Sequence, residues 1–247
     1  MLNDLLLLSG NDIPFPQAQL VIHQPTIKEI GLIGEEMFYM GCEILTFSKD
    51  NLSEEDRNNL VHQSDFEILM SMITSRNLPS AMQKNKIAMM MVLSLLFPEC
   101  EIKFTSKEIL CSKEDEVHSI NSQNFNNFKE ILTQMFCLKG LSSKDSSDYN
   151  PAGQLAKQIA DKFKKRHQIL AAQKGEQKIS ILSRYVSILT IGENKDMNTL
   201  LQYTVYQLFD EFHRYELKEE FDYILRARLA GARDLKDPDN WKKDIHE

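Results

Sequence analysis

The sequence predicts a mainly helical protein with a helical bundle-like architecture, a small β element and two subdomains. Apolar residues recur at spacings of three and four along most of the chain, and strand-like alternation is confined to two short stretches. Gly and Pro are scarce, at 9 and 7 among 247 residues. Hydrophobic residues make up 42% of the chain and charged residues 26%, which is typical of a folded protein that can be stabilised by burial alone.

The predicted β element consists of an N-terminal strand and one hairpin. The strand covers residues 19–22, and the hairpin joins residues 101–104 to residues 108–111 through Thr105-Ser106-Lys107. The two segments resemble a small hairpin with alternating faces, which is typical of strands with one buried face.

Capping residues predict where several N-terminal helices begin. Thr26 and Glu29 have the spacing of a capping box, and the apolar pattern behind them continues to Ile44 as one helix. Similar capping residues predict a helix near residues 51–62, and Ser64 with Asp65 predicts the start of the next one.

A longer helix is predicted from Pro79 to Phe97, where Pro98 ends it. Its apolar residues include Met82, Ile87, Met90, Met91, Leu95 and Leu96. The helix is rich in methionine, so its apolar surface is interpreted either as the centre of a core or as an adaptable groove for a partner helix. The second interpretation makes Met89 and Met90 candidate partner-binding residues.

A polar segment rich in Ser and Asp, residues 139–150, predicts a linker between an acidic, mostly helical domain over residues 1–138 and an all-helical domain over residues 151–247. The charges change at the same place: residues 1–150 carry 12 basic and 21 acidic side chains, whereas residues 151–247 carry 17 and 15. The two parts therefore present different charges to partners.

The second domain is predicted to open with a basic helix. Asn150 and Pro151 are favourable first residues of a helix, and the outer face that follows includes Lys164, Lys165 and Arg166. This face is interpreted as a solvated surface or as a site for an acidic protein, including the chain's own first half. Nucleic acid is not expected, because no aromatic residues interleave with the lysines and the whole chain carries a net charge of −7.

Residues 197–232 contain the densest helical pattern of the chain, with two apolar stripes that differ in phase. The change of phase predicts a bend near Tyr215, and Gly231 is expected to end the second helix. Arg214 and Tyr215, between the stripes, are candidate partner-binding residues. Trp241 in the polar tail either folds back on the last helices or anchors a partner.

The sequence contains no catalytic, cofactor-binding or metal-binding motif. HExxH, GxSxG and GxxxxGK[ST] are absent, and none of the four cysteines forms a CxxC pair, so they are expected to be reduced thiols. His213, Asp210 and Glu211 are interpreted as side chains that pair along the exposed face of a helix, and not as an acid–base site. The longest apolar block, residues 87–97, is too short to span a membrane, which takes about 20 residues.

Two stretches resemble a group of poorly characterised proteins from tailed bacteriophages of low-GC bacteria. The first is QPTIKEIGLIGEEMFYMGCEIL at residues 24–45, and the second is LLQYTVYQLFDEFHRYELKEEFDYILRARLAGA at residues 200–232. The matching positions are Pro25, Thr26, Lys28, Glu29, Ile30, Gly34, Glu35, Asn150, Pro151, Thr204, Gln207, Leu208, Phe209, Asp210, Phe212, Arg214 and Leu229 to Ala232.

Proteins of this group are encoded among tail morphogenesis genes and are similar to tail assembly chaperones. The resemblance implies a non-enzymatic viral protein that binds the tape measure protein, tail tube subunits or both during virion morphogenesis in the host cytoplasm. An acidic, helix-rich chain that carries methionines suits such protein–protein interaction. The alternatives are a structural virion component (a baseplate, neck or tail terminator subunit), a regulatory or anti-defence binding protein, and a homo-oligomer of any of these.

Overall fold

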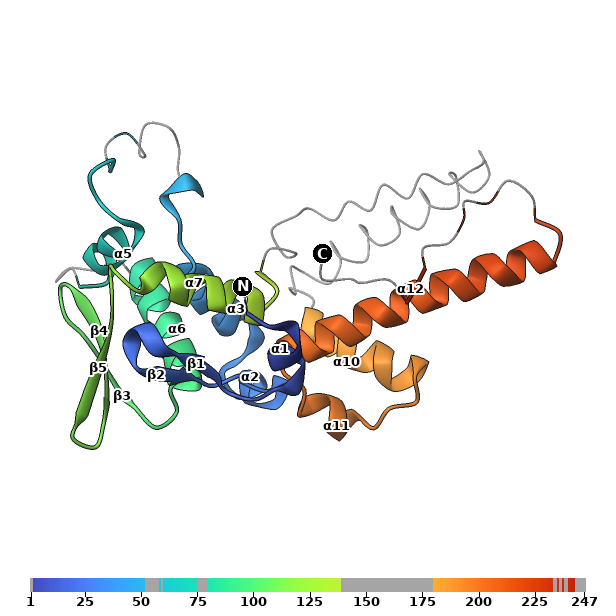
Figure 1. The fold of residues 1–247 in the computed structure, drawn as a ribbon, viewed down its shortest axis with the longest axis horizontal. Helices are drawn as coiled ribbons and strands as arrows, with labels where there is room; N and C mark the ends of the chain where they lie inside the picture. The colour runs from blue at the N-terminus through green and yellow to red at the C-terminus, as the bar shows by residue number, and fades with distance from the viewer. Residues whose placement is uncertain are drawn as a thin grey trace.

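The computed structural model describes residues 2–51, 58, 60–74, 80–138, 180–232, 235, 237 and 240–242 (Figure 1). As predicted, these residues form mainly helices, together with two small antiparallel sheets. The helices are α1 (Asp4–Ser9), α2 (Ile27–Ile33), α3 (Glu35–Leu45), α5 (Asp65–Thr74), α6 (Ser80–Leu96), α7 (Phe125–Met135), α10 (Ile181–Gly192), α11 (Met197–Leu201) and α12 (Val205–Leu229). The strands are β1 (Ile13–Phe15), β2 (Leu20–Ile22), β3 (Glu101–Phe104), β4 (Glu108–Lys113) and β5 (Glu116–Asn121).

The two sheets include the predicted strands and add others. β2 pairs with β1, and the predicted hairpin is confirmed as the β3–β4 pair, with Ile102 opposite Cys111. The prediction missed β5, which pairs with β4 along its whole length. Its apolar residues Val117 and Ile120 are three positions apart and lie on opposite faces, so the sequence shows no alternation there.

The helix predicted from Thr26 to Ile44 is two helices. The capping box of Thr26 and Glu29 begins α2 as expected, but Gly34 ends it with φ +87° and α3 begins at the next residue. This φ lies in the region that glycine adopts without strain, so the chain turns at Gly34.

The predicted bend near Tyr215 is wrong, because α12 is continuous from Val205 to Leu229. The break lies earlier, where α11 ends and Thr204 forms a second capping box with Gln207. The predicted end of the segment is confirmed: Gly231, with φ +90°, donates its amide to the carbonyl of Arg228, and Ala232 donates to that of Ala227.

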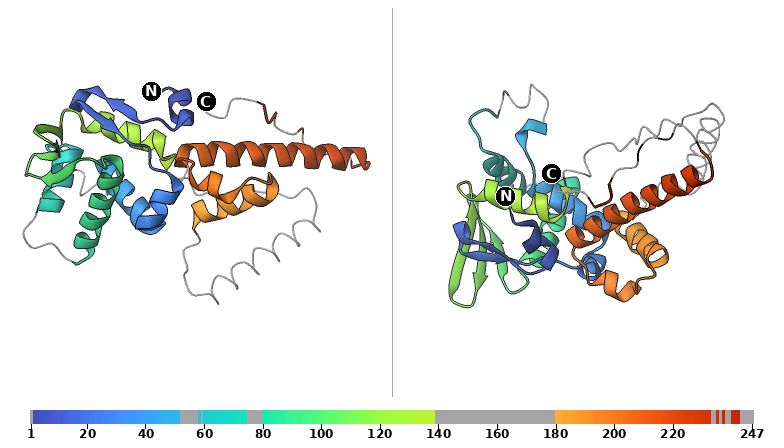
Figure 2. Two further views of the ribbon diagram at one scale, coloured as in Figure 1. Left: turned by 90° about the horizontal axis from the view of Figure 1, so that it is seen from below. Right: turned by 45° about the vertical axis from the view of Figure 1, so that its right-hand side comes forward.

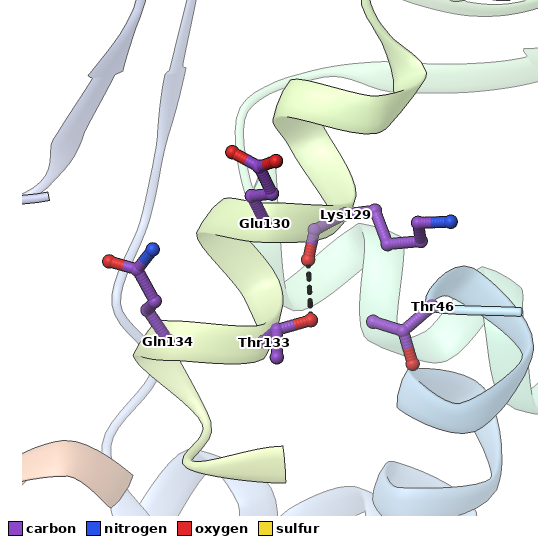
Figure 3. A pocket seen from close by; sticks show the side chains of 5 residues that line it. All are labelled: Thr46, Lys129, Glu130, Thr133 and Gln134. Atoms are coloured by element: carbon purple, nitrogen blue, oxygen red, sulfur yellow. Dashed lines mark hydrogen bonds between the residues drawn. The ribbon is translucent and has the colours of Figure 1, made fainter. Parts of the chain in front are cut away.

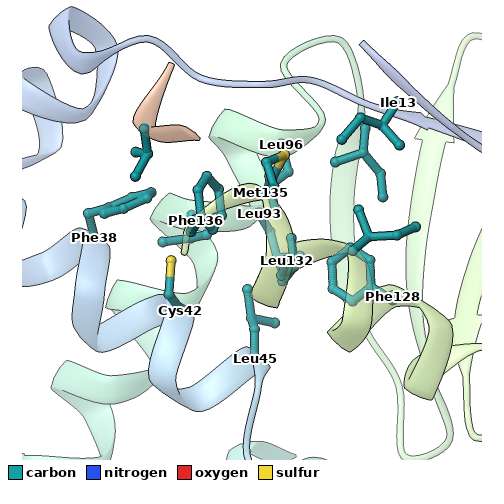
Figure 4. Close-up of a cluster of buried hydrophobic side chains, with 14 of the residues drawn as sticks. Ile13, Phe38, Cys42, Leu45, Leu93, Leu96, Phe128, Leu132, Met135 and Phe136 are labelled. Atoms are coloured by element: carbon teal, nitrogen blue, oxygen red, sulfur yellow. The ribbon is translucent and has the colours of Figure 1, made fainter. Parts of the chain in front are cut away.

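The core lies where α3, α6, α7 and the strand pair β1–β2 meet (Figure 4). Phe38 and Phe136 pack edge to face, with ring centroids 4.8 Å apart. α3 crosses α6 closely at Gly41, where an added Cβ would lie 2.5 Å from the carbonyl oxygen of Ala88. Any larger side chain at Gly41 would therefore push the two helices apart.

The parts before and after the predicted linker are joined by hydrogen bonds. The amide of Ile27 donates to the carbonyl of Tyr203 over 2.8 Å, so the two capping boxes lie side by side. The Glu35 carboxylate accepts from the amides of Ile181 and Leu182, over 2.8 and 3.3 Å, and from the Ser180 hydroxyl. A single apolar cluster also includes residues of both parts.

The division into two subdomains at residues 139–150 stays a prediction, because the linker lies outside the described residues. The same holds for the basic helix and for most of the helix predicted near residues 51–62. In the described chain, α12 extends away from the sheets and from α3, α6 and α7, with α10 and α11 along its first half (Figures 1 and 2).

Candidate protein-binding surfaces

The outward face of α6 carries a row of apolar side chains. Ile87, Met90 and Met91, named here the α6 row, are 49%, 39% and 37% exposed. Met90 and Met91 follow Ile87 by three and four positions, about one helical turn, so the three residues share one side of the helix. The opposite side packs into the core through Ala88, Met89, Val92, Leu93 and Leu96.

The structure assigns the two predicted roles of this helix to its two sides. Ile87, Met90 and Met91 lie on the exposed side, while Met89, which was predicted to bind a partner, is completely buried. Met89 therefore cannot contact a partner in this structure, whereas its neighbour Met90 can. Because the helix is apolar on nearly all sides, the spacing of its residues did not distinguish the two faces.

Charged groups lie beside the α6 row. The Lys84 ammonium lies 3.1 Å from the Glu36 carboxylate of α3, and the Lys86 ammonium lies 6.0 Å from the centre of the Phe104 ring. An apolar strip beside charged groups is the usual composition of a protein-binding surface, in which apolar contacts supply affinity and the polar rim stays hydrated.

A second surface follows α12 and the C-terminal tail, meaning the described residues 235, 237 and 240–242. One guanidinium nitrogen of Arg214 donates to the carbonyl oxygen of Trp241 over 3.2 Å. The structure thus brings two of the predicted partner-binding residues together, and Trp241 lies back along the last helix while remaining partly exposed.

Tyr215 lies on another side of α12, against α10. Its hydroxyl occupies the space in which a Cβ on Gly192 would lie, so Gly192 is needed for this contact. Tyr215 is partly buried there. The remaining predicted partner-binding residues, Lys164, Lys165 and Arg166, lie outside the described residues.

A shallow pocket of about 220 Å³ lies between α7 and the end of α3 (Figure 3). It is lined by Thr46, Lys129, Glu130, Thr133 and Gln134. This volume is below the roughly 300–1,000 Å³ typical of small-molecule sites. The Lys129 ammonium, which is the positive charge lining this pocket, lies 2.7 Å from the Asp65 carboxylate. This ion pair gives Lys129 a structural role.

The Asp65–Lys129 pair is largely buried and affects the titration of the aspartate. Burial by itself raises the pKa of Asp65, but hydrogen bonds from Lys129 and from the amide of Lys49, together with the charge of Lys129, lower it below its ordinary value. The pair ties α7 to the start of α5.

Several titratable side chains meet where α3, α7 and α12 approach each other. Burial raises the pKa of the Cys137 thiol to about 12, and the nearby charge of Asp210 acts in the same direction. Burial also raises the pKa of Tyr39 and of Tyr206, whose hydroxyl donates to Asp4 over 3.2 Å. At neutral pH these groups are protonated, so Cys137 lacks the thiolate that a reactive cysteine needs.

The other sequence candidates occupy separate environments. His213 lies 3.9 Å from Glu216 on an exposed part of α12, while Glu211 pairs with Lys195, so the histidine and this carboxylate have different partners. The four cysteines are free, and burial raises the pKa of Cys42 and of Cys111, the latter to about 12.

The described residues carry neither a group of side chains that could hold a metal ion nor a helix that could cross a membrane. In this part of the chain, no three His, Cys, Asp or Glu side chains are grouped in a way that could hold a metal ion. No helix among the described ranges has the length and apolar character needed to cross a membrane.

The C-terminal part of the chain is similar to a known family domain. A family model described as the YomV second domain matches residues 173–246, a stretch that contains α10, α11, α12 and the described tail. No curated protein and no solved structure matches the chain.

Proposed function

We propose that this protein is a non-enzymatic assembly protein of a tailed bacteriophage that acts as a chaperone in the host cytoplasm. Its partner is an apolar helical segment of the tape measure protein or of a tail tube subunit, held until the tail polymerises. The observation that carries the proposal is the α6 row, in which two methionines and an isoleucine remain accessible on a helix fixed in the core.

Methionine suits this role because its side chain is unbranched and polarisable, and it adapts to partners of different shape. Fully burying a side chain of this size contributes about 1.5–3 kcal/mol. Between 37% and 49% of each residue in the α6 row is still exposed, so a partner helix would gain about 2–4 kcal/mol from the three together. That gain corresponds to roughly 30- to 1,000-fold in affinity.

The proposal is tested with overlapping peptides from the helical stretches of the tape measure and tail tube proteins encoded by the same phage. Binding to the full chain is measured by fluorescence anisotropy. The paired substitution Met90→Glu and Met91→Glu is expected to weaken the tightest complex at least tenfold, because it places charge in an apolar contact.

The matched control is the paired substitution Ile191→Glu and Leu229→Glu, which puts the same two charges on apolar residues that are 82% and 81% exposed and lie outside the α6 row. This control is expected to bind like the natural protein, and circular dichroism checks that all variants are folded. Failure of every peptide to bind the natural protein, or equal binding by the Met90/Met91 variant, would overturn the proposal.

A further inference from the structure

The strand β3 forms one edge of the three-stranded sheet. The strands are ordered β3–β4–β5, so within the sheet β3 pairs only on the side that faces β4. In the described part of the chain, no backbone hydrogen bond joins the other side of β3 to another segment. Such a free edge presents a row of amide and carbonyl groups that can pair with one more strand.

The register with β4 identifies the backbone groups on this free edge. The amide of Thr105 donates to the carbonyl of Glu108 over 2.9 Å, directly beyond the last paired residues of the two strands. Hydrogen-bonded and non-hydrogen-bonded pairs alternate along an antiparallel ladder, so Lys103 and Glu101 also direct their amides and carbonyls toward β4. The amides and carbonyls of Ile102 and Phe104 therefore point outward from the free edge.

The side chains of β3 are divided between the two faces of the sheet. Ile102 and Phe104 are partly buried and pack against the core, and the Lys86 ammonium of α6 lies 6.0 Å from the centre of the Phe104 ring. Glu101 and Lys103 are exposed on the opposite face, and their charged groups lie 2.9 Å apart. Because these side chains are 66% and 60% exposed, their pairing contributes little to stability and can be exchanged for pairing with another molecule.

The sequence of β3 is complementary to itself in an antiparallel arrangement. When two copies pair through their free edges around Ile102, each Ile102 amide donates to the Ile102 carbonyl of the other copy. Glu101 of each copy then lies opposite Lys103 of the other. These are non-hydrogen-bonded pairs, in which the side chains of neighbouring strands approach most closely.

Charge selects this register over its two neighbours. The outward-pointing groups of two copies meet only if Ile102 lies opposite an outward-pointing residue, so the pairing can shift only in whole steps. One step in one direction places Lys103 opposite Lys103, and one step in the other places Glu101 opposite Glu101. Like charges directly opposite each other are destabilising, so the arrangement around Ile102 is favoured.

We propose that β3 is the interface of a symmetric dimer, in which a second copy of this chain adds its own β3 along the free edge. The two three-stranded sheets then become one antiparallel sheet of six strands. The two-fold axis passes beside Ile102, so each contact is made twice. The proposal depends on β3 alone and goes beyond the function proposed for the α6 row.

The test measures association of the full chain by sedimentation velocity over a series of concentrations. Glu101→Lys places a lysine opposite Lys103 of the second copy, and Lys103→Glu places a glutamate opposite Glu101. Each single variant is expected to associate at least about tenfold more weakly than the natural protein, because two attractive pairs become two repulsive ones. An equimolar mixture of the two variants should restore association, because one β3 then carries both lysines and the other both glutamates.

Two further comparisons separate strand pairing from a general effect of charge. Glu219→Lys makes the same change of charge at an exposed position of α12 and is expected to leave association unchanged. Ile102→Pro removes the outward amide at the centre of the pairing, and proline is tolerated on the free side of an edge strand. This variant should not associate, whereas Ile102→Val, which keeps the amide, should associate like the natural protein. Circular dichroism checks that every variant is folded.

Three results would overturn the inference. The first is a natural protein that remains monomeric up to its solubility limit. The second is association that survives both single charge changes, because the interface would then lie elsewhere on the molecule. The third is an equimolar mixture of the two charge variants that associates no better than either variant alone.

Discussion

Replacement of Glu35 by alanine should destabilise the whole protein, because this carboxylate joins two parts of the chain that are far apart in sequence. It accepts hydrogen bonds from the amides of Ile181 and Leu182 at the start of α10, and from the Ser180 hydroxyl. The amides at a helix start have no partner within the helix, and the helix dipole favours a negative charge there.

The expected loss in the free energy of unfolding is about 2 kcal/mol. Hydrogen bonds to a charged group contribute about 1.5–3 kcal/mol, and loss of a helix cap costs about 1 kcal/mol. Water replaces part of these hydrogen bonds in the variant, which reduces the sum. For a chain of this size, that loss lowers the melting temperature by about 4–8 °C. Urea unfolding followed by circular dichroism measures it directly.

The neighbouring residue provides the matched control. Glu36 lies in the same first turn of α3 but pairs on the surface with Lys84, and both side chains are more than half exposed. Replacement of Glu36 by alanine should therefore cost less than about 1 kcal/mol. Equal unfolding midpoints for the two variants would refute the conclusion that Glu35 fastens α10 to α3.

Three further substitutions test other parts of the structure. Asp65→Asn should destabilise the protein by about 1–2 kcal/mol at pH 7. Because the folded pKa of Asp65 is lowered, its contribution is present above the unfolded value and disappears as the pH falls, so urea midpoints of variant and natural protein should converge below about pH 4. Phe212→Ala should cost about 3–5 kcal/mol in urea unfolding, whereas Leu229→Ala, at an 81% exposed position, should change stability by less than about 0.5 kcal/mol. Thr204→Ala should cost about 1 kcal/mol in thermal unfolding by removing one half of a capping box, and an unchanged melting temperature would contradict that role.

Local signals in the sequence predicted several features of the fold. The Thr26–Glu29 capping box, the Gly231 helix end and the β3–β4 hairpin each depend on a few adjacent residues whose chemistry restricts the backbone. β5 lacked such a signal, because its apolar residues Val117 and Ile120 lie three positions apart and do not alternate with polar residues.

Features that depend on distant contacts could not be predicted in the same way. The change of phase within α12 was interpreted as a bend, but the helix is continuous and the side of it that is buried changes. Phe212 faces α10, whereas Leu217, five positions or about 140° farther around the same helix, is buried on another side.

The candidate partner-binding residues also depend on distant contacts, so the sequence predicted them only in part. Met90 was predicted as a partner-binding residue and is exposed, but Met89, predicted with it, is buried, and the sequence did not show that Ile87 and Met91 share the exposed side with Met90. Arg214 and Trp241 were chosen separately, and only the structure shows their hydrogen bond. The ion pair between Arg228 and Asp237 likewise had no signal in the sequence, because it forms between two exposed charged side chains on either side of the helix end.

The proposed chaperone function is tested most directly by quantitative mass spectrometry on cells infected with the parent phage and on purified particles from the same infection. We expect the protein to co-purify with the tape measure protein from infected cells and to be absent from finished particles. Its presence in purified particles at a fixed ratio to the tail tube subunit would contradict the account and would identify the protein as a structural component of the virion.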